Sequence, residues 1–123
     1  MSNHILIIED NPTMRSFLSV LLGQKYKLIT KESGEGALAW LDGHNHTNLI
    51  ICDYKLGGID GLEFIRRVKS LDQYQRTPFI FLSGKNGSDT RVACLKAGAH
   101  DFIVKPFNPG ELMLKVERII ESS

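Results

Sequence analysis

A run of apolar residues from Leu49 to Cys52 ends directly in the carboxylate of Asp53, and a glycine-rich segment, residues 54–61, follows at once. A short continuous apolar run between turn signals is typical of a strand that is buried on both faces, as in a parallel sheet. Asp53 would then lie at the carboxyl end of that strand, where an open α/β sheet binds its ligands. Because a carboxylate at the edge of a hydrophobic core is costly to desolvate, we expect Asp53 to have partners.

Four more apolar segments have the length and composition of strands. They are His4–Ile8, Lys27–Thr30, Phe79–Leu82 and Phe102–Val104. The segment that starts at Lys27 is the most polar of them, so we expect it at an edge of the sheet.

The segments between these strands have apolar residues at helical spacing and begin with residues that favour helix starts. The predicted helices begin near Pro12, Ser33, Asp60, Ser88 and Pro109, and the first and fourth end at Gly23 and Gly98. Asp60 and Glu63 have the spacing of a capping box. We expect the apolar stripes to be buried, including Phe17 on the first helix and Val92 and Leu95 on the fourth.

Five strands that alternate with five helices predict a single α/β domain, with a parallel sheet covered by helices on both faces. The chain has 123 residues and a formal charge of +1, which gives no electrostatic reason to expect a nucleic acid or an anionic membrane as a partner. No apolar run approaches the roughly 20 residues of a membrane span, and the amino-terminal residues lack a signal-peptide pattern. Cys52 and Cys94 are expected to be buried thiols, which is typical of a reducing cytoplasm.

Short polar signals follow four of the five predicted strands. Glu9 and Asp10 follow the first strand, Asp53 ends the third, Ser83 the fourth and Lys105 the fifth. Because the carboxyl ends of parallel strands meet at one edge of the sheet, these side chains should surround a single crevice. Each residue alone has an ordinary structural explanation, such as helix capping or a surface lysine, but chance is a poor explanation for all of them together.

The charges of this group suggest its chemistry. Two carboxylates about 4 Å apart repel each other by on the order of 4 kcal/mol at an effective dielectric constant near 20, so three carboxylates need a cation or a proton. Oxygen ligands with few protein carboxylates suit Mg²⁺, which keeps waters and accepts a substrate phosphate. Lys105 and the hydroxyl of Ser83 would then face a ligand anion. The set predicts a phosphoryl-transfer site with Asp53 as the nucleophile.

This combination resembles the receiver domain of bacterial two-component response regulators. The matching elements are Glu9-Asp10, Asp53, Ser83, Lys105-Pro106-Phe107 and the segment 97–103 that leads to the lysine. The resemblance extends from Ile5 to Ile120 and identifies the whole chain, 1–123, as one receiver domain. It implies a doubly wound, flavodoxin-like sheet with the strand order 2-1-3-4-5.

The resemblance also implies a role for each residue of the site. Asp53 would accept a phosphoryl group from the phosphohistidine of a partner kinase. Mg²⁺, with Mn²⁺ as an alternative, would be bound by Asp10, Asp53 and the backbone carbonyl of Lys55, and by Glu9 through water. Lys105 would bind the phosphoryl oxygens and would precede Pro106 in a cis peptide bond.

Ser83 and Phe102 would form the two-state switch that the resemblance implies. Ser83 would move to bind the phosphate and Phe102 would follow it inward, which would alter the surface from the fourth helix to the fifth. The implied partners are a sensor histidine kinase or phosphotransfer protein, and a downstream protein or an output domain absent from this chain. A phosphorylation-dependent homodimer is a weaker expectation, because Ala97 and His100 stand where the dimer-forming branch has acidic residues.

Three features depart from the family pattern. Gly57 stands where a proline is common, so the loop after Asp53 is expected to be looser. Phe102 replaces a frequent tyrosine and therefore lacks the hydroxyl that could anchor it. Lys55 and Lys85 lie two residues beyond Asp53 and Ser83, where side chains tune the loss of phosphate.

Other functions are less consistent with these residues. A flavodoxin-like FMN site would need a hydroxyl-rich phosphate loop where this chain has Glu9-Asp10, and a haloacid-dehalogenase-type phosphatase would need an acid where it has Lys55. The main alternative is a pseudo-receiver, an unphosphorylated interaction module, which would be expected to lack part of the acidic site. We therefore expect a regulatory phosphoacceptor whose only catalysed reactions are its own phosphorylation and dephosphorylation at Asp53.

Overall fold

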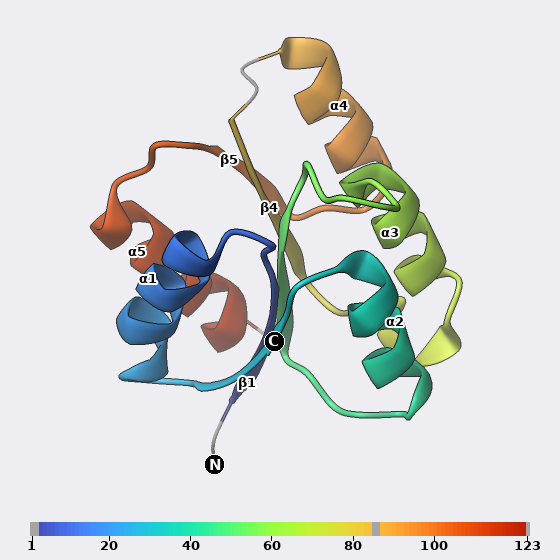
Figure 1. Cartoon of the computed structure of the whole chain (residues 1–123), viewed down its shortest axis with the longest axis horizontal. Helices are drawn as coiled ribbons and strands as arrows, with labels where there is room; N and C mark the ends of the chain where they lie inside the picture. The colour runs from blue at the N-terminus through green and yellow to red at the C-terminus, as the bar shows by residue number, and fades with distance from the viewer. Residues whose placement is uncertain (1–2, 85–86, 123) are drawn as a thin grey trace.

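The structure, a computed structural model, describes residues 3–84 and 87–122. Its centre is a parallel five-stranded sheet with the strand order β2-β1-β3-β4-β5. Figure 1 shows the sheet between two layers of helices. The strands are β1 (His4–Ile8), β2 (Lys27–Lys31), β3 (Leu49–Asp53), β4 (Phe79–Ser83) and β5 (Asp101–Val104). The predicted fold class and strand order are confirmed, and β2 is at an edge, as its polar composition indicated.

Five α-helices cover the two faces of the sheet. They are α1 (Pro12–Gly23), α2 (Gly34–Asp42), α3 (Gly61–Lys69), α4 (Ser88–Lys96) and α5 (Pro109–Glu121), and a short 3₁₀ turn spans Asp72–Tyr74. In Figure 1, α1 and α5 lie on one face and α2, α3 and α4 lie on the other. None of the helices in the described ranges is long and apolar enough to cross a membrane.

The alternation of side chains along each strand supplies two separate cores. In β1, Ile5 and Ile7 pack with residues of α1 and α5, whereas Leu6 and Ile8 pack with residues of α2 and α3. Every residue of β3 and β4 is buried, as expected of central strands with helices on both faces. Burial of an aliphatic or aromatic side chain contributes about 1.5–3 kcal/mol, so this double core fixes the sheet that supports the strand ends.

Helices α1, α2 and α3 begin with a capping side chain, whereas α4, which was predicted to begin at Ser88, has Gly87 as its N-cap and no side-chain cap. The side chains of Asn11, Ser33 and Asp60 each accept a hydrogen bond from a backbone N–H in the first turn of their helix. Only the Asp60 half of the predicted capping box is present, since the carboxylate of Glu63 contacts Arg67 one turn later. Each of these caps lies in the loop between a strand and the next helix, so the caps also fix the loops at the carboxyl edge of the sheet.

Some expectations about apolar stripes were wrong. Phe17 is 41% exposed, and Val92 and Leu95 on α4 are 46% and 38% exposed. Helix α4 packs against the edge strand β5, and Cys94 is its only fully buried residue in the described range, so its apolar contact is a narrow strip. Phe64, which was not predicted to be in the core, is fully buried against Phe79.

Candidate functional site

Three carboxylates meet at the carboxyl edge of the sheet. Glu9 and Asp10 follow β1, Asp53 ends β3, and each offers an oxygen atom that lies within 4.8 Å of the others. Glu9 and Asp53 are buried and Asp10 is exposed. The prediction that the ends of neighbouring strands would gather these acids is confirmed.

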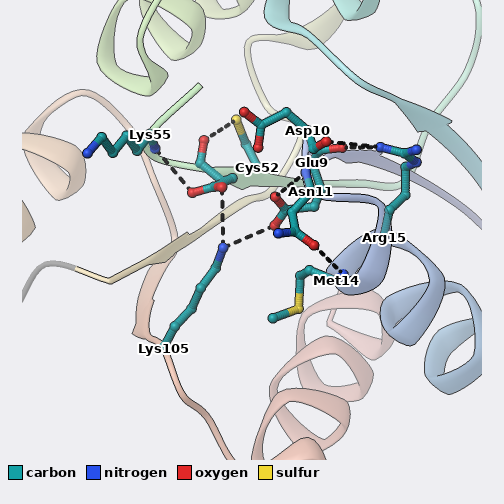
Figure 2. A network of polar contacts seen from close by, with 9 residues as sticks. Glu9, Asp10, Asn11, Met14, Arg15, Cys52, Lys55 and Lys105 are labelled. Carbon is teal, nitrogen blue, oxygen red and sulfur yellow. Dashed lines mark hydrogen bonds and ion pairs between the residues drawn. The ribbon is translucent and has the colours of Figure 1, made fainter. Parts of the chain in front are cut away.

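Lys105 provides the positive charge at this acidic cluster, as Figure 2 shows. Its ammonium nitrogen lies 3.0 Å from Oε1 of Glu9 and 3.2 Å from Oδ2 of Asp53. The Lys105 side chain is only 21% exposed, so the pairs are largely shielded from water. The backbone N–H of Lys105 donates to the carbonyl of Ser83, and the Lys105–Pro106 bond is cis, as predicted.

The loop after β3 holds the second oxygen of Asp53. The N–H of Lys55 donates to Oδ1 at 3.1 Å, so the two carboxylate oxygens of Asp53 have different partners. The Sγ of Cys52 donates to the backbone carbonyl of Asp53 at 3.2 Å, and burial raises the pKa of this thiol well above its ordinary value. The role of the Lys55 carbonyl as a metal ligand stays a prediction.

Charge and burial oppose each other at Glu9. Burial raises the pKa of the Glu9 carboxyl above its ordinary value, against the hydrogen bonds from Lys105 and from the N–H of Asn11. Burial lowers the pKa of Lys105, but its contacts with Glu9 and Asp53 outweigh this effect and raise that pKa overall. The lysine therefore stays protonated and compensates the cluster at neutral pH.

The predicted switch residues lie on neighbouring strands. Ser83 is buried at the end of β4, and Phe102 on β5 is 3% exposed, so its ring lies inside the protein. Arg91 on α4 donates to the Phe102 carbonyl at 3.3 Å. The movement of Ser83 and Phe102 stays a prediction, and Lys85 lies outside the described residues.

The acidic cluster opens into a crevice of about 690 Å³. The lining residues are Glu9, Asp10, Asn11, Thr13, Met14, Phe17, Asp53 and Lys105. The contributions of Thr13, Met14 and Phe17 to this site were not predicted. The signal available in the sequence was their position in the first turns of the helix that begins directly after the acidic pair.

The cluster has the chemistry of a site for a small divalent cation and a phosphate. Its donors are hard carboxylate oxygens from three residues, which suits Mg²⁺. An ammonium group beside the Asp53 carboxylate can bind the oxygens of a phosphoryl group. The residues present therefore fit a magnesium ion.

Comparisons with known proteins agree with this geometry. The sequence pattern of the response regulator receiver domain matches residues 5–117. A two-component response regulator of rice, ORR3, is 34% identical over 95% of this chain and 90% of its own length. The chemotaxis response regulator CheY4 of Vibrio cholerae superposes with a TM-score of 0.90 at 28% identity, covering 97% of this chain and 99% of the other.

A third relative was solved with a metal ion. The receiver domain of the sensor histidine kinase PA1611 of Pseudomonas aeruginosa superposes with a TM-score of 0.89 at 27% identity and covers 98% of this chain and 99% of its own. That protein has a magnesium ion coordinated in its active-site cleft. Similarity of this kind therefore extends to receiver domains of kinases as well as to response regulators of bacteria and plants.

Proposed function

This chain belongs to the response regulator receiver domain family, and from that premise we propose that Asp53 is the phosphoacceptor of a two-component system. The observation that carries the proposal is the arrangement around Asp53. Its carboxylate lies with two further acids at the carboxyl edge of the sheet and is paired with Lys105. A site of this composition favours phosphoryl transfer over simple structural pairing, since it keeps a nucleophile, a cation and an accessible crevice together.

The proposed reaction is a displacement at phosphorus. An oxygen of the Asp53 carboxylate attacks the phosphorus of a phosphohistidine, an O–P bond forms, and the P–N bond breaks with its electron pair going to the imidazole. The ring nitrogen takes a proton from solvent, so the products are an acyl phosphate on Asp53 and a free, neutral histidine on the partner. Lys105 keeps its proton and follows the transferred group by exchanging its contact with the carboxylate for one with the phosphoryl oxygens.

Glu9, Asp10, Asp53 and the Lys55 carbonyl would hold Mg²⁺, and Mn²⁺ is the alternative ion. When bound, the ion would neutralise the carboxylates and the phosphoryl oxygens as they approach each other. Glu9 and Lys105 keep the crevice polar, and the N–H of Lys55 orients Asp53 through its other oxygen. The donor set and the three acids within 4.8 Å support this assignment.

Phosphorylation is proposed to shift an equilibrium between two states of Ser83 and Phe102. The buried ring of Phe102 and the contact of its carbonyl with Arg91 on α4 supply a connection from the site to the surface of α4, β5 and α5. The partners would be a sensor histidine kinase or phosphotransfer protein upstream, and a protein or output domain downstream. The chain would act as a regulatory phosphoacceptor that turns over only its own aspartyl phosphate, and a phosphorylation-dependent homodimer is one form its output could take.

The experiment that tests the proposal is incubation of the protein with acetyl phosphate and Mg²⁺, followed by intact-mass measurement. We expect one phosphoryl group per chain, its removal by hydroxylamine, and no incorporation in Asp53→Asn. Asp60→Asn is the matched control, because Asp60 caps α3 and asparagine is an equally good cap. A native chain that stays unmodified by acetyl phosphate and by a kinase would support the pseudo-receiver alternative.

A further inference from the structure

Arg15 reaches back from α1 to the turn that carries two of the three acids. Its Nη1 donates to the carbonyl of Glu9 at 2.9 Å and lies 3.5 Å from the carbonyl of Asp10. Helical side chains point toward the amino terminus of their helix, so a residue in this position is directed at the loop before α1. Figure 2 shows the guanidinium at Glu9 and Asp10, away from Lys105.

The two acids differ in what fixes them. The carboxylate of Glu9 is buried and held by Lys105 and the N–H of Asn11. Asp10 is exposed, and within residues 3–84 and 87–122 no hydrogen bond or ion pair holds its carboxylate. The position of the Asp10 side chain therefore depends on the backbone to which it is attached, and Arg15 binds that backbone.

The charge of Arg15 is itself balanced. Its Nη2 pairs with Oε1 of Glu32, just beyond β2, at 3.2 Å. A bare guanidinium so close to the acids would repel a metal ion, and the pair with Glu32 offsets that repulsion. The same pair, together with the bond from the Glu9 N–H to the Lys31 carbonyl, ties the turn to the edge strand.

We propose that Arg15 is a positioning residue for the divalent-cation site, holding the Glu9–Asp10 backbone so that both carboxylates meet that of Asp53. This inference rests on the proposed function, since it assumes that the three acids bind Mg²⁺. Residues that orient metal ligands without touching the metal typically change affinity by about 10–100-fold when they are replaced. The alternative is that Arg15 acts only through its charge, in which case its removal would strengthen the binding of a cation.

The two possibilities differ in the sign of one measured effect. We expect Arg15→Met to raise the Mg²⁺ dissociation constant, measured by calorimetric titration, by about tenfold. Phosphorylation by acetyl phosphate should then require about tenfold more Mg²⁺ for half-saturation, with its rate at saturating Mg²⁺ within about twofold of the native rate. Arg15→Lys keeps a cation that can bind one carbonyl, so it should recover part of the affinity.

Two further variants control the measurement. Arg67→Met removes another arginine that is paired with a glutamate, on α3, and should leave Mg²⁺ affinity unchanged. Glu32→Gln removes the charge of the partner of Arg15 but leaves the contacts of Arg15 with the carbonyls, and should change affinity less than threefold. Thermal melts followed by circular dichroism would establish that each variant is folded at the assay temperature.

The outcomes separate this inference from the proposed function. A native protein that binds no Mg²⁺ and incorporates no phosphate would overturn both. If the native protein binds Mg²⁺ and incorporates phosphate, but Arg15→Met binds Mg²⁺ as tightly as the native protein or more tightly, only the positioning role of Arg15 is overturned. The positioning role would also be contradicted if Arg15→Met were phosphorylated more slowly at saturating Mg²⁺ but needed the same Mg²⁺ concentration for half-saturation as the native protein.

Discussion

The ammonium of Lys105 lies 3.2 Å from a carboxylate oxygen of Asp53, although the strand β4 separates their two strands in the sheet. The lysine crosses this distance because it follows β5 directly and has a long, flexible stem. The consequence is that the carboxylate at the centre of the site is compensated by a cation before any ligand arrives. Neutralisation of the acids is therefore a structural requirement of the folded protein as well as a feature of its proposed chemistry.

Replacement of Lys105 by methionine should lower the free energy of unfolding by about 1–3 kcal/mol, because the buried carboxylates of Glu9 and Asp53 lose their cation. Urea denaturation at neutral pH measures the loss. Mg²⁺ should restore more stability to this variant than to the native protein, since a bound cation replaces the missing charge.

Lys115→Met is the matched control for this lysine. Lys115 pairs with Asp101 at 3.0 Å, but both side chains are more exposed than those of the buried acids. We expect its removal to cost about 0.2–1 kcal/mol. If Lys105→Met and Lys115→Met lowered the free energy of unfolding equally, burial of Glu9 and Asp53 would add nothing to the stabilisation that Lys105 provides.

Lys69 is expected to be a strong contributor to stability outside the site. Its ammonium donates to the carbonyls of Tyr74, Gln75 and Thr77 in the segment that leads to β4. Lys69→Met keeps the apolar stem but removes the donor, and should lower the free energy of unfolding by about 1–3 kcal/mol. The exposed Lys96 provides the control, because Lys96→Met should change stability by less than about 0.5 kcal/mol in the same urea titration.

Two adjacent glycines in the loop after Asp53 should respond in opposite ways to alanine. Gly58 has a φ of +86°, which alanine adopts only with strain, and a Cβ there would lie 2.5 Å from Oε2 of Glu35. Gly58→Ala should therefore lower the free energy of unfolding by about 1 kcal/mol. A Cβ at Gly57 would have no neighbouring heavy atom within 4 Å, so Gly57→Ala should leave that free energy unchanged or raise it by up to about 1 kcal/mol. Equal melting temperatures for Gly58→Ala and Gly57→Ala would contradict the expected difference between the two positions.

The lifetime of the phosphorylated form should depend on Lys55 and Lys85. The side chain of Lys55 is exposed beside Asp53, and its backbone N–H already contacts that carboxylate. Replacement of both lysines by alanine should change the rate of phosphate loss, which can be followed by intact mass after the donor is removed. Lys96→Ala is the control for the loss of a surface lysine. An unchanged decay rate in the double variant would refute the role of both side chains.

The sequence predicted the elements that depend on local patterns. The apolar runs before Asp53 and Ser83, and the helix-start residues Ser33 and Asp60, are local signals, and each lies where it was expected. The meeting of acids from different strands could also be predicted, because parallel strands direct their carboxyl ends to one edge.

Contacts that depend on the angle at which a helix packs could not be predicted. Arg15 and Lys69 bind backbone carbonyls, which every residue offers, so no residue type marks their partners in the sequence. Phe17 and Val92 fit an apolar stripe by spacing, but the helices turn these positions toward solvent. Whether such a position is buried or exposed depends on how its helix packs against the sheet, which the spacing of apolar residues does not specify.

The pair between Glu9 and Lys105 joins positions that are 96 residues apart in the chain. On a ribosome, the acids of the first and third strands emerge long before the lysine that compensates them. A nascent chain whose fifth strand, β5, is still inside the ribosome therefore lacks Lys105 at this centre, even if its earlier segments have folded. The polar centre at the carboxyl edge of the sheet is therefore assembled only after β5 and Lys105 have been synthesised.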